Sequence, residues 1–139
     1  MNTYNINDDN FINSDLYKDF IKENPSRGNL RIRAYTASGA IPIKDLKVTI
    51  STQYKSANII FYEGETNESG VIEKISLPAP KLINDNLDVP KKTTYEILAV
   101  YEPEKLNNVY KVNMYEDVCV VQNINVAPKT LDVGEFRWQ

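Results

Sequence analysis

The most constraining feature of this chain is that apolar and polar residues alternate along most of its length. Leu30-Arg31-Ile32-Arg33-Ala34 is the clearest example. Successive side chains of a strand point to opposite faces, so a period of two places the apolar residues on one buried side. The pattern predicts strands over 30–34, 46–51, 58–65, 71–77, 93–101, 109–114 and 118–124, with a last edge pairing over 130–137.

Turn signals separate these segments. Thr66-Asn67-Glu68-Ser69-Gly70 closes on a glycine that is free to adopt positive φ, and Pro78 and Pro80 end the strand that follows. About seven short strands with regular turns are typical of an antiparallel Greek-key β-sandwich. We therefore predict an all-β fold in which Tyr95 and Tyr101 share the face of Ile97 and Ala99.

Residues 1–28 differ from the rest and are predicted as a tail and a short helix, with the sandwich over 29–139. Residues 1–10 show no period and are expected to be a loose tail. Ser14 suits the N-cap of a helix that ends before Pro25, and Leu16 and Phe20 lie on one side of it. So short a helix must dock on its own domain or on a partner.

Arg31 and Arg33 are expected to point outward from the first sandwich strand. Two interpretations stay open. With Arg27 they face Asp15 and Asp19 and so dock the helix, or they meet an anionic partner.

Composition excludes several functional classes. The chain has no histidine and one cysteine, so Ser-His and Cys-His nucleophile pairs, internal disulfides and cysteine zinc sites are ruled out. The net charge of −3 gives no nucleic-acid footprint. The N-terminus lacks the pattern of a secretory signal and no apolar run is long enough to span a membrane, so we expect a cytoplasmic protein, with release by lysis or packaging into a larger structure left open.

No arrangement of carboxylates in the sequence indicates catalysis or a cofactor. Asp85 and Asp88 lie in an oxygen-rich stretch, but the spacing and closing glutamate of a calcium loop are missing, so no metal is expected. Cys119 has no basic sequence neighbour and is predicted to fill the core.

Aromatic residues provide the binding candidates. The chain has nine tyrosines and one tryptophan, and aromatic rings stack on sugars and are favoured at interfaces. Tyr54, Tyr115 and Trp138 lie near predicted strand ends rather than in core positions. Together with Arg31 and Arg33 they form the predicted ligand-binding set.

Residues 23–51 and 61–80 resemble carboxypeptidase-regulatory-like domains, which have a transthyretin-like (prealbumin-like) sandwich. Asn24-Pro25-Ser26-Arg27-Gly28 resembles the entry segment of the firmicute stand-alone form, which is similar to a module in clostridial spore cortex-lytic enzymes. The likeness covers about residues 15–128. Tyr101-Glu102-Pro103-Glu104 departs from it by lacking the usual glycine, so the turn that follows the strand at 93–101 is expected to have a different shape.

The sequence and this resemblance together predict a non-catalytic interaction module. The resemblance implies association with spores or the cell envelope and binding to peptidoglycan or another cell-wall glycan, or to a protein partner. Two alternatives are a carboxylate-based hydrolase and a structural subunit that oligomerises through an open sheet edge.

Overall fold

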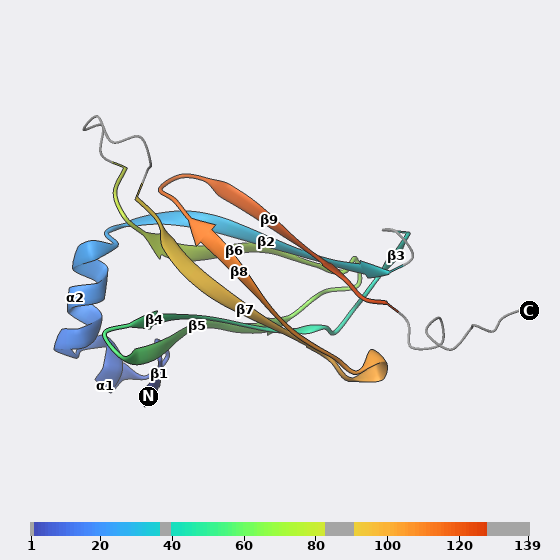
Figure 1. Ribbon diagram of the computed structural model, residues 1–139, viewed down its shortest axis with the longest axis horizontal. Coiled ribbons are helices and arrows are strands. Elements are labelled where there is room, and N and C mark those ends of the chain that lie inside the picture. Colours follow the sequence, from blue (N-terminus) through green and yellow to red (C-terminus); the bar gives the residue numbers. More distant parts are fainter. Residues whose placement is uncertain (1, 37–39, 83–90, 128–139) are drawn as a thin grey trace, which may run out of the picture.

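The computed structural model describes residues 2–36, 40–82 and 91–127, and these form two β-sheets packed face to face (Figure 1). The first sheet has the order β1-β5-β4-β7-β8, and the second has the order β3-β2-β6, with β9 also paired to β2. The strands are β1 (Asn2–Asn5), β2 (Ser26–Thr36), β3 (Ile41–Pro42), β4 (Lys47–Tyr54), β5 (Ala57–Glu65), β6 (Val71–Ala79), β7 (Thr93–Tyr101), β8 (Leu106–Met114) and β9 (Cys119–Asn125). The helices are α1 (Asp9–Ile12), α2 (Asp15–Glu23) and the 3-10 helix η1 (Glu102–Glu104).

The predicted all-β sandwich with a short N-terminal helix is confirmed. Its sheets are mixed, because β1 pairs with β5 in parallel and β9 pairs with β2 in parallel. Alternation of apolar residues shows which face of a strand is buried, but not whether the strand runs parallel or antiparallel to its neighbour. These two parallel pairings could therefore not be predicted.

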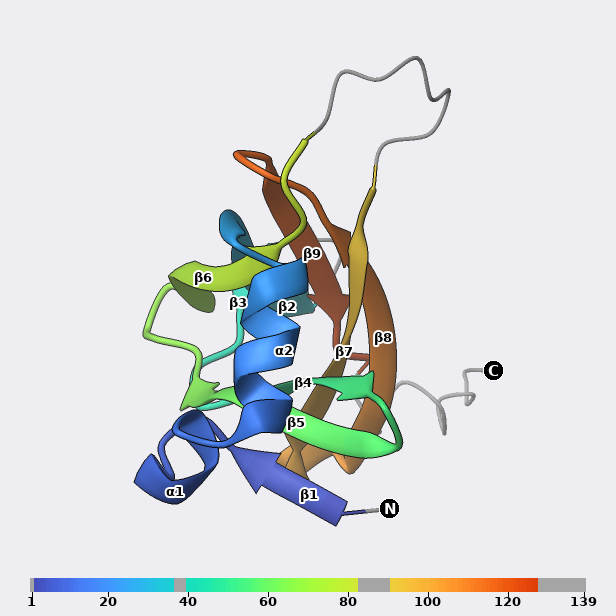
Figure 2. The same ribbon diagram turned by 90° about the vertical axis from the view of Figure 1, so that its left-hand side faces the viewer.

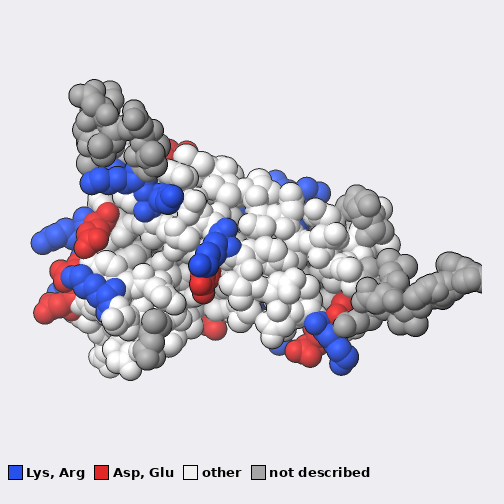
Figure 3. Space-filling view, viewed as in Figure 1, with Lys and Arg blue, Asp and Glu red and all other residues white. Residues whose placement is uncertain are grey.

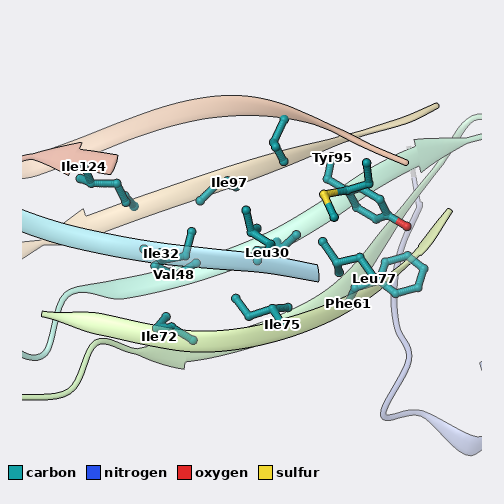
Figure 4. Packing of buried hydrophobic residues seen from close by; sticks show 14 of the residues in the cluster. Leu30, Ile32, Val48, Phe61, Ile72, Ile75, Leu77, Tyr95, Ile97 and Ile124 are labelled. Carbon is teal, nitrogen blue, oxygen red and sulfur yellow. The ribbon is translucent and has the colours of Figure 1, made fainter. Parts of the chain in front are cut away.

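The core lies between the two sheets and draws residues from both (Figure 4). Tyr95 is fully buried, and its hydroxyl donates to the carbonyl oxygen of Pro78 at 2.6 Å, which links β7 to β6 across the sandwich. Burial raises the pKa of the Tyr95 hydroxyl. Ile97 and Ala99 are buried on the same side of β7, as the alternation predicts. The other fully buried large side chains are Phe20, Leu30, Ile32, Leu46, Val48, Ile50, Ile59, Leu77, Met114 and Ile124.

The first residues of the chain form structure where the sequence predicted a loose tail. β1 adds to the edge of β5, and the Asp8 side chain accepts a hydrogen bond from the Asn10 backbone N–H to cap α1. Phe11 is buried and stacks on the ring of Tyr4, with 4.8 Å between the ring centroids. The prediction was wrong because these apolar residues follow no regular period.

Helix α2 lies across one end of the sandwich, between the two sheets (Figure 2). Ser14 caps it as predicted, and Phe20 enters the core within 5.4 Å of Phe61 and 5.2 Å of Tyr54, measured between ring centroids. One of the two open interpretations, that the arginines dock the helix on Asp15 and Asp19, is not borne out, because no such ion pair is present among the described residues. Asp19 pairs instead with Lys55 of the β4–β5 hairpin at 3.4 Å.

Cys119 is exposed, so the prediction that it fills the core is wrong. In the parallel register Cys119 lies opposite Asn29 of β2, on the outward side of the sheet, and the buried residue of β9 is Ile124. The predicted strand at 130–137, the Asp85–Asp88 stretch and Trp138 lie outside the described residues. No helix in the described part of the chain has the length and apolar character that a membrane crossing requires.

Candidate functional site

Strand β2 presents a row of arginines on the outer face of its sheet. Leu30, Ile32 and Ala34 are buried in the core, so the residues between them point away from it. Arg27, Arg31 and Arg33 occupy this outward row, which we call the arginine face. Because β2 is flanked by β6 on one side and β9 on the other, the row runs along the middle of the sheet rather than along an edge.

The three arginines are held to different degrees. Arg27 is tied down, since its Nε donates to the Ser76 hydroxyl at 2.6 Å and its Nη2 donates to the Ser76 carbonyl at 3.1 Å. Arg31 has one long ion pair, 3.7 Å to Glu73, and its buried Nε has no acceptor among the described residues. Among the described residues, Arg33 makes one long hydrogen bond, 3.4 Å to the neutral side chain of Asn123. The guanidinium group of Arg27 is therefore more firmly held than those of Arg31 and Arg33.

A pocket of about 210 Å³ opens beside Arg33, and we call it the Arg33 pocket. The Arg33 guanidinium lies over the ring of Tyr35, 5.6 Å from its centroid, which orients the group along the sheet surface. The pocket is lined by Arg33, Ala34, Tyr35, Pro42, Ser69 and Gly70.

The turn that supplies Ser69 is held by its own hydrogen bonds. The Asn67 side chain accepts from the backbone N–H groups of Ser69 and Val71, at 2.9 and 3.1 Å. Gly70 has φ of 73°, and a Cβ there would come within 2.4 Å of the Ala34 carbonyl oxygen. Only glycine fits at this position, so the turn packs against β2 and fixes Ser69 at the pocket wall.

The Arg33 pocket has the chemistry of an anion site. A guanidinium offers a planar set of donors that matches carboxylate and phosphate oxygens, and the Ser69 hydroxyl adds another donor. Glu68 lies on the same turn but does not line the pocket. The lining residues include no carboxylate or other group that moves protons near neutrality, so the pocket itself offers recognition and no acid–base pair.

Tyr54 is used to hold helix α2. Its hydroxyl donates to the Glu23 carboxylate at 2.5 Å, and this hydrogen bond raises the pKa of the Tyr54 phenol. The Lys55 ammonium lies 5.3 Å from the centroid of the Tyr54 ring. The contacts of Tyr54 thus join the β4–β5 hairpin to the end of α2.

Tyr115 lies at the turn between β8 and β9, beside a second polar cluster. Its neighbour Glu116 accepts hydrogen bonds from the Leu82 backbone N–H at 2.6 Å and from the Ser26 hydroxyl at 2.7 Å. These two donors, in that order, lower the pKa of Glu116, and Lys81 lies 3.9 Å away. Glu116 therefore joins the start of β2 to the segment after β6.

The structure does not bring the predicted aromatic residues together. Tyr54 lies at the β4–β5 hairpin, Tyr115 lies at the β8–β9 turn, and Trp138 falls outside the described residues. Arg31 and Arg33 are neighbours on the arginine face, as the alternation predicts. Ser69, Tyr35 and Pro42 were missed as pocket residues, because they meet Arg33 only through the pairing of β2 with β3 and β6.

Other candidate sites in the described residues are less suited to a ligand. A pocket of about 200 Å³ lies between Tyr4 and Leu16, but two of its polar side chains, Asp8 and Ser14, already serve as helix caps. No group of three carboxylate or cysteine side chains in the described part of the chain is placed to hold a metal ion.

No family model and no curated protein matches the sequence. Solved structures that resemble this chain include 5-hydroxyisourate hydrolase from Klebsiella pneumoniae, at 16% identity and a TM-score of 0.48 over 71% of this chain and 90% of that one. Catechol 1,2-dioxygenase from Acinetobacter sp. ADP1, inhibited by bound mercury, has 9% identity and a TM-score of 0.45 over 91% of this chain and 57% of that one. (S)-allantoin synthase has 10% identity and a TM-score of 0.46 over 73% and 41%.

The TM-scores of all three structures lie below 0.5, so the sandwich fold of this chain rests on its own strand pairing. The chain spans little more than half of the dioxygenase and less than half of the synthase.

The prediction of a non-catalytic module, and with it the prediction that the chain is not an enzyme, is contradicted by this comparison, because all three of these structures are of enzymes. Likenesses this distant transfer no residue role and no substrate. The physical reason for the error is that absence of histidine excludes one kind of acid–base chemistry, not catalysis as a whole.

Proposed function

We propose that this protein binds a small carboxylate- or phosphate-bearing molecule in the Arg33 pocket. The observation that carries the proposal is the weak engagement of Arg33, whose one hydrogen bond within the described part of the chain runs 3.4 Å to a neutral amide. Hydrogen bonds to charged groups contribute about 1.5–3 kcal/mol, more than bonds between neutral groups. An anionic ligand therefore gives the Arg33 guanidinium the charged hydrogen-bond acceptor that the protein itself does not provide in this pocket.

The surroundings of Arg33 favour a small ligand that enters the pocket. The pocket has room for a few heavy atoms, and its turn is fixed by Asn67 and Gly70 before any ligand arrives. A preformed wall lowers the entropy lost on binding. Ser69 is the second donor of the proposed site.

Calorimetric titration of the full chain at low ionic strength tests the proposal, with inorganic phosphate and succinate as separate probes. We expect saturable binding of at least one probe and about a tenfold or greater loss of affinity in Arg33→Gln, because a charged hydrogen bond is removed. Arg27→Gln is the matched control, since Arg27 is already bound to Ser76, and its affinity should stay within about twofold of wild type. Equal losses in both variants would show a diffuse charge effect and refute a site at Arg33.

Turnover is followed separately for any organic anion that binds. The carboxylates of the described residues do not converge on the Arg33 pocket, so no residue is assigned a catalytic role.

We also keep the location of the protein as a proposal. The resemblance suggests the firmicute stand-alone form and association with spores or the cell envelope, and the cytoplasm is the alternative location. Fractionation of cells that express the native protein, followed by immunoblotting, distinguishes these locations.

A further inference from the structure

Few hydrogen-bond donors remain for a ligand at the Arg33 pocket, because three of the backbone N–H groups around it are already used. The N–H of Ser69 donates to the Asn67 side chain at 2.9 Å, and the N–H of Gly70 donates to the Asn67 carbonyl oxygen at 2.9 Å. The N–H of Ala34 donates to the Gly70 carbonyl oxygen at 2.7 Å. The main donors left for a ligand are therefore the Arg33 guanidinium and the Ser69 hydroxyl.

This small set of donors matches a carboxylate better than a phosphate. A carboxylate has two oxygens and one negative charge, which a single guanidinium balances. A phosphate monoester has three acceptor oxygens and a charge of about −1.5 to −2 at pH 7, and phosphate sites commonly use free backbone N–H groups. In the part of the chain that the structure describes, Arg33 is the one basic residue that lines the pocket.

The charges around the pocket disfavour a second negative charge on the ligand. Glu68 precedes Ser69 on the same turn, so its carboxylate adds negative charge near the site. Figure 3 shows that basic and acidic side chains gather densely at the α2 end of the molecule, whereas Arg33 lies toward the other end of β2. The pocket therefore suits a ligand with one negative charge.

The walls beside the two donors are made largely of carbon. The Tyr35 ring lies under the Arg33 guanidinium, and Pro42 packs against the turn, where a Cβ on Gly70 would come within 3.1 Å of the Pro42 Cβ. The volume of about 210 Å³ is smaller than the roughly 300–1,000 Å³ of pockets that take drug-sized ligands. The pocket thus has room for a short apolar group beside the carboxylate.

We propose that the ligand of the Arg33 pocket is a small monocarboxylate with a short apolar body. This inference rests on the proposed anion site and narrows its ligand class. The carboxylate accepts hydrogen bonds from Arg33 and Ser69, and the apolar body lies against Tyr35 and Pro42. Arg33 then determines whether the site binds an acid, and the Pro42 wall determines how strongly it prefers a longer one.

Nuclear magnetic resonance titrations of the full chain with acetate, butyrate, butyramide and inorganic phosphate at constant ionic strength test the inference. Each buried methylene raises affinity about fourfold, so butyrate, which has two more methylenes, should bind about tenfold or more tightly than acetate. Phosphate should bind more weakly than butyrate. Butyramide keeps the apolar body without the charge and should bind much more weakly than butyrate.

Pro42→Ser removes the apolar wall, and should lower the ratio of butyrate to acetate affinity about threefold or more while the acetate affinity stays within about twofold of wild type. Ile41→Ser is the matched control, since Ile41 is 53% exposed on the same short strand and does not line the pocket, so the ratio should not change. Ser69→Ala should weaken both acids by the same factor. Circular dichroism melts establish that each variant is folded, and the wild-type ligand series stands on its own if a variant does not fold.

The outcomes separate this inference from the proposed function. Equal affinities for acetate and butyrate, tighter binding of phosphate than of butyrate, or an unchanged ratio in a folded Pro42→Ser variant would overturn the inference and leave the anion site in place. Butyramide binding as tightly as butyrate would also overturn it, since the carboxylate would then play no part. If none of acetate, butyrate, succinate and phosphate binds beside Arg33, the proposed function fails as well.

Discussion

At the α2 end of the sandwich a short polar contact joins Glu23 to Tyr54, whereas Arg31 and Arg33 of the arginine face have long contacts with their nearest partners. Glu23 and Tyr54 meet at 2.5 Å, but Arg31 and Arg33 reach their nearest partners at 3.7 and 3.4 Å. The first region joins segments far apart in the sequence and supports the fold. The second leaves donors available, which is why we place ligand binding there. The following predictions separate these two kinds of polar surface.

Phe20→Ala should have the largest effect, because it tests whether packing or charge holds the α2 end. Phe20 is 2% exposed and contacts both Tyr54 and Phe61. Removing a buried phenylalanine costs about 3–5 kcal/mol of unfolding free energy. Urea denaturation measures it. A loss under about 1 kcal/mol would mean that packing of Phe20 does not hold the α2 end.

Tyr95→Phe should cost less, about 1–3 kcal/mol, because it leaves the buried carbonyl of Pro78 without its donor while the ring remains. In urea denaturation we expect a lower unfolding free energy and an unchanged m-value. Tyr62→Phe is a control, since no hydrogen bond of the Tyr62 hydroxyl is recorded among the described residues. If both variants lose the same stability, the hydroxyl bond that links β7 to β6 is not important.

Glu116→Gln should remove an acid-dependent part of the stability. The pKa of Glu116 is lowered in the folded state, so its contribution is present above the pKa of the unfolded chain, near 4.3, and is lost as the pH falls through the lower folded pKa. We expect a flatter decline of unfolding free energy below about pH 4.5 in the variant. Thermal melts between pH 3 and 7 measure this, and parallel wild-type and variant curves would contradict it.

Arg33→Gln should have the smallest effect on folding, within about 0.5 kcal/mol, because Arg33 is exposed and weakly bonded. Urea denaturation checks this value. A large loss of stability would show that the contacts of Arg33 support the fold, as those at the α2 end do. The reason for placing a ligand beside Arg33 would then be gone.

Much of the fold was predictable because most strands bury one face. The predicted strand at 93–101 has the bounds of β7, and the Ser14-capped helix is α2. Alternation also predicted the outward direction of Arg31 and Arg33. It could not predict β1 or α1, whose apolar residues lack a period, nor the exposure of Cys119, which follows from the parallel register of β9 on β2.

The candidate site was predictable only in part. Its arginines lie on one strand and can be found from local alternation, whereas its other walls come from the turn at Ser69 and from Pro42 of β3. Those segments meet β2 through long-range strand pairing, which leaves no local pattern in the sequence. Tyr54 was a reasonable binding candidate by composition, but its hydroxyl is bound to Glu23 of a helix that lies far from it along the chain.

The most direct test of the account is a nuclear magnetic resonance titration of the ¹⁵N-labelled full chain with inorganic phosphate at constant ionic strength. We predict saturable shifts of the Arg33 side-chain Nε–H and of the Ser69 and Gly70 amides, which disappear in Arg33→Gln, while the Arg27 side chain is unaffected. Shifts spread evenly over the basic side chains, or no saturable shift at the Arg33 pocket with phosphate or succinate, would contradict it.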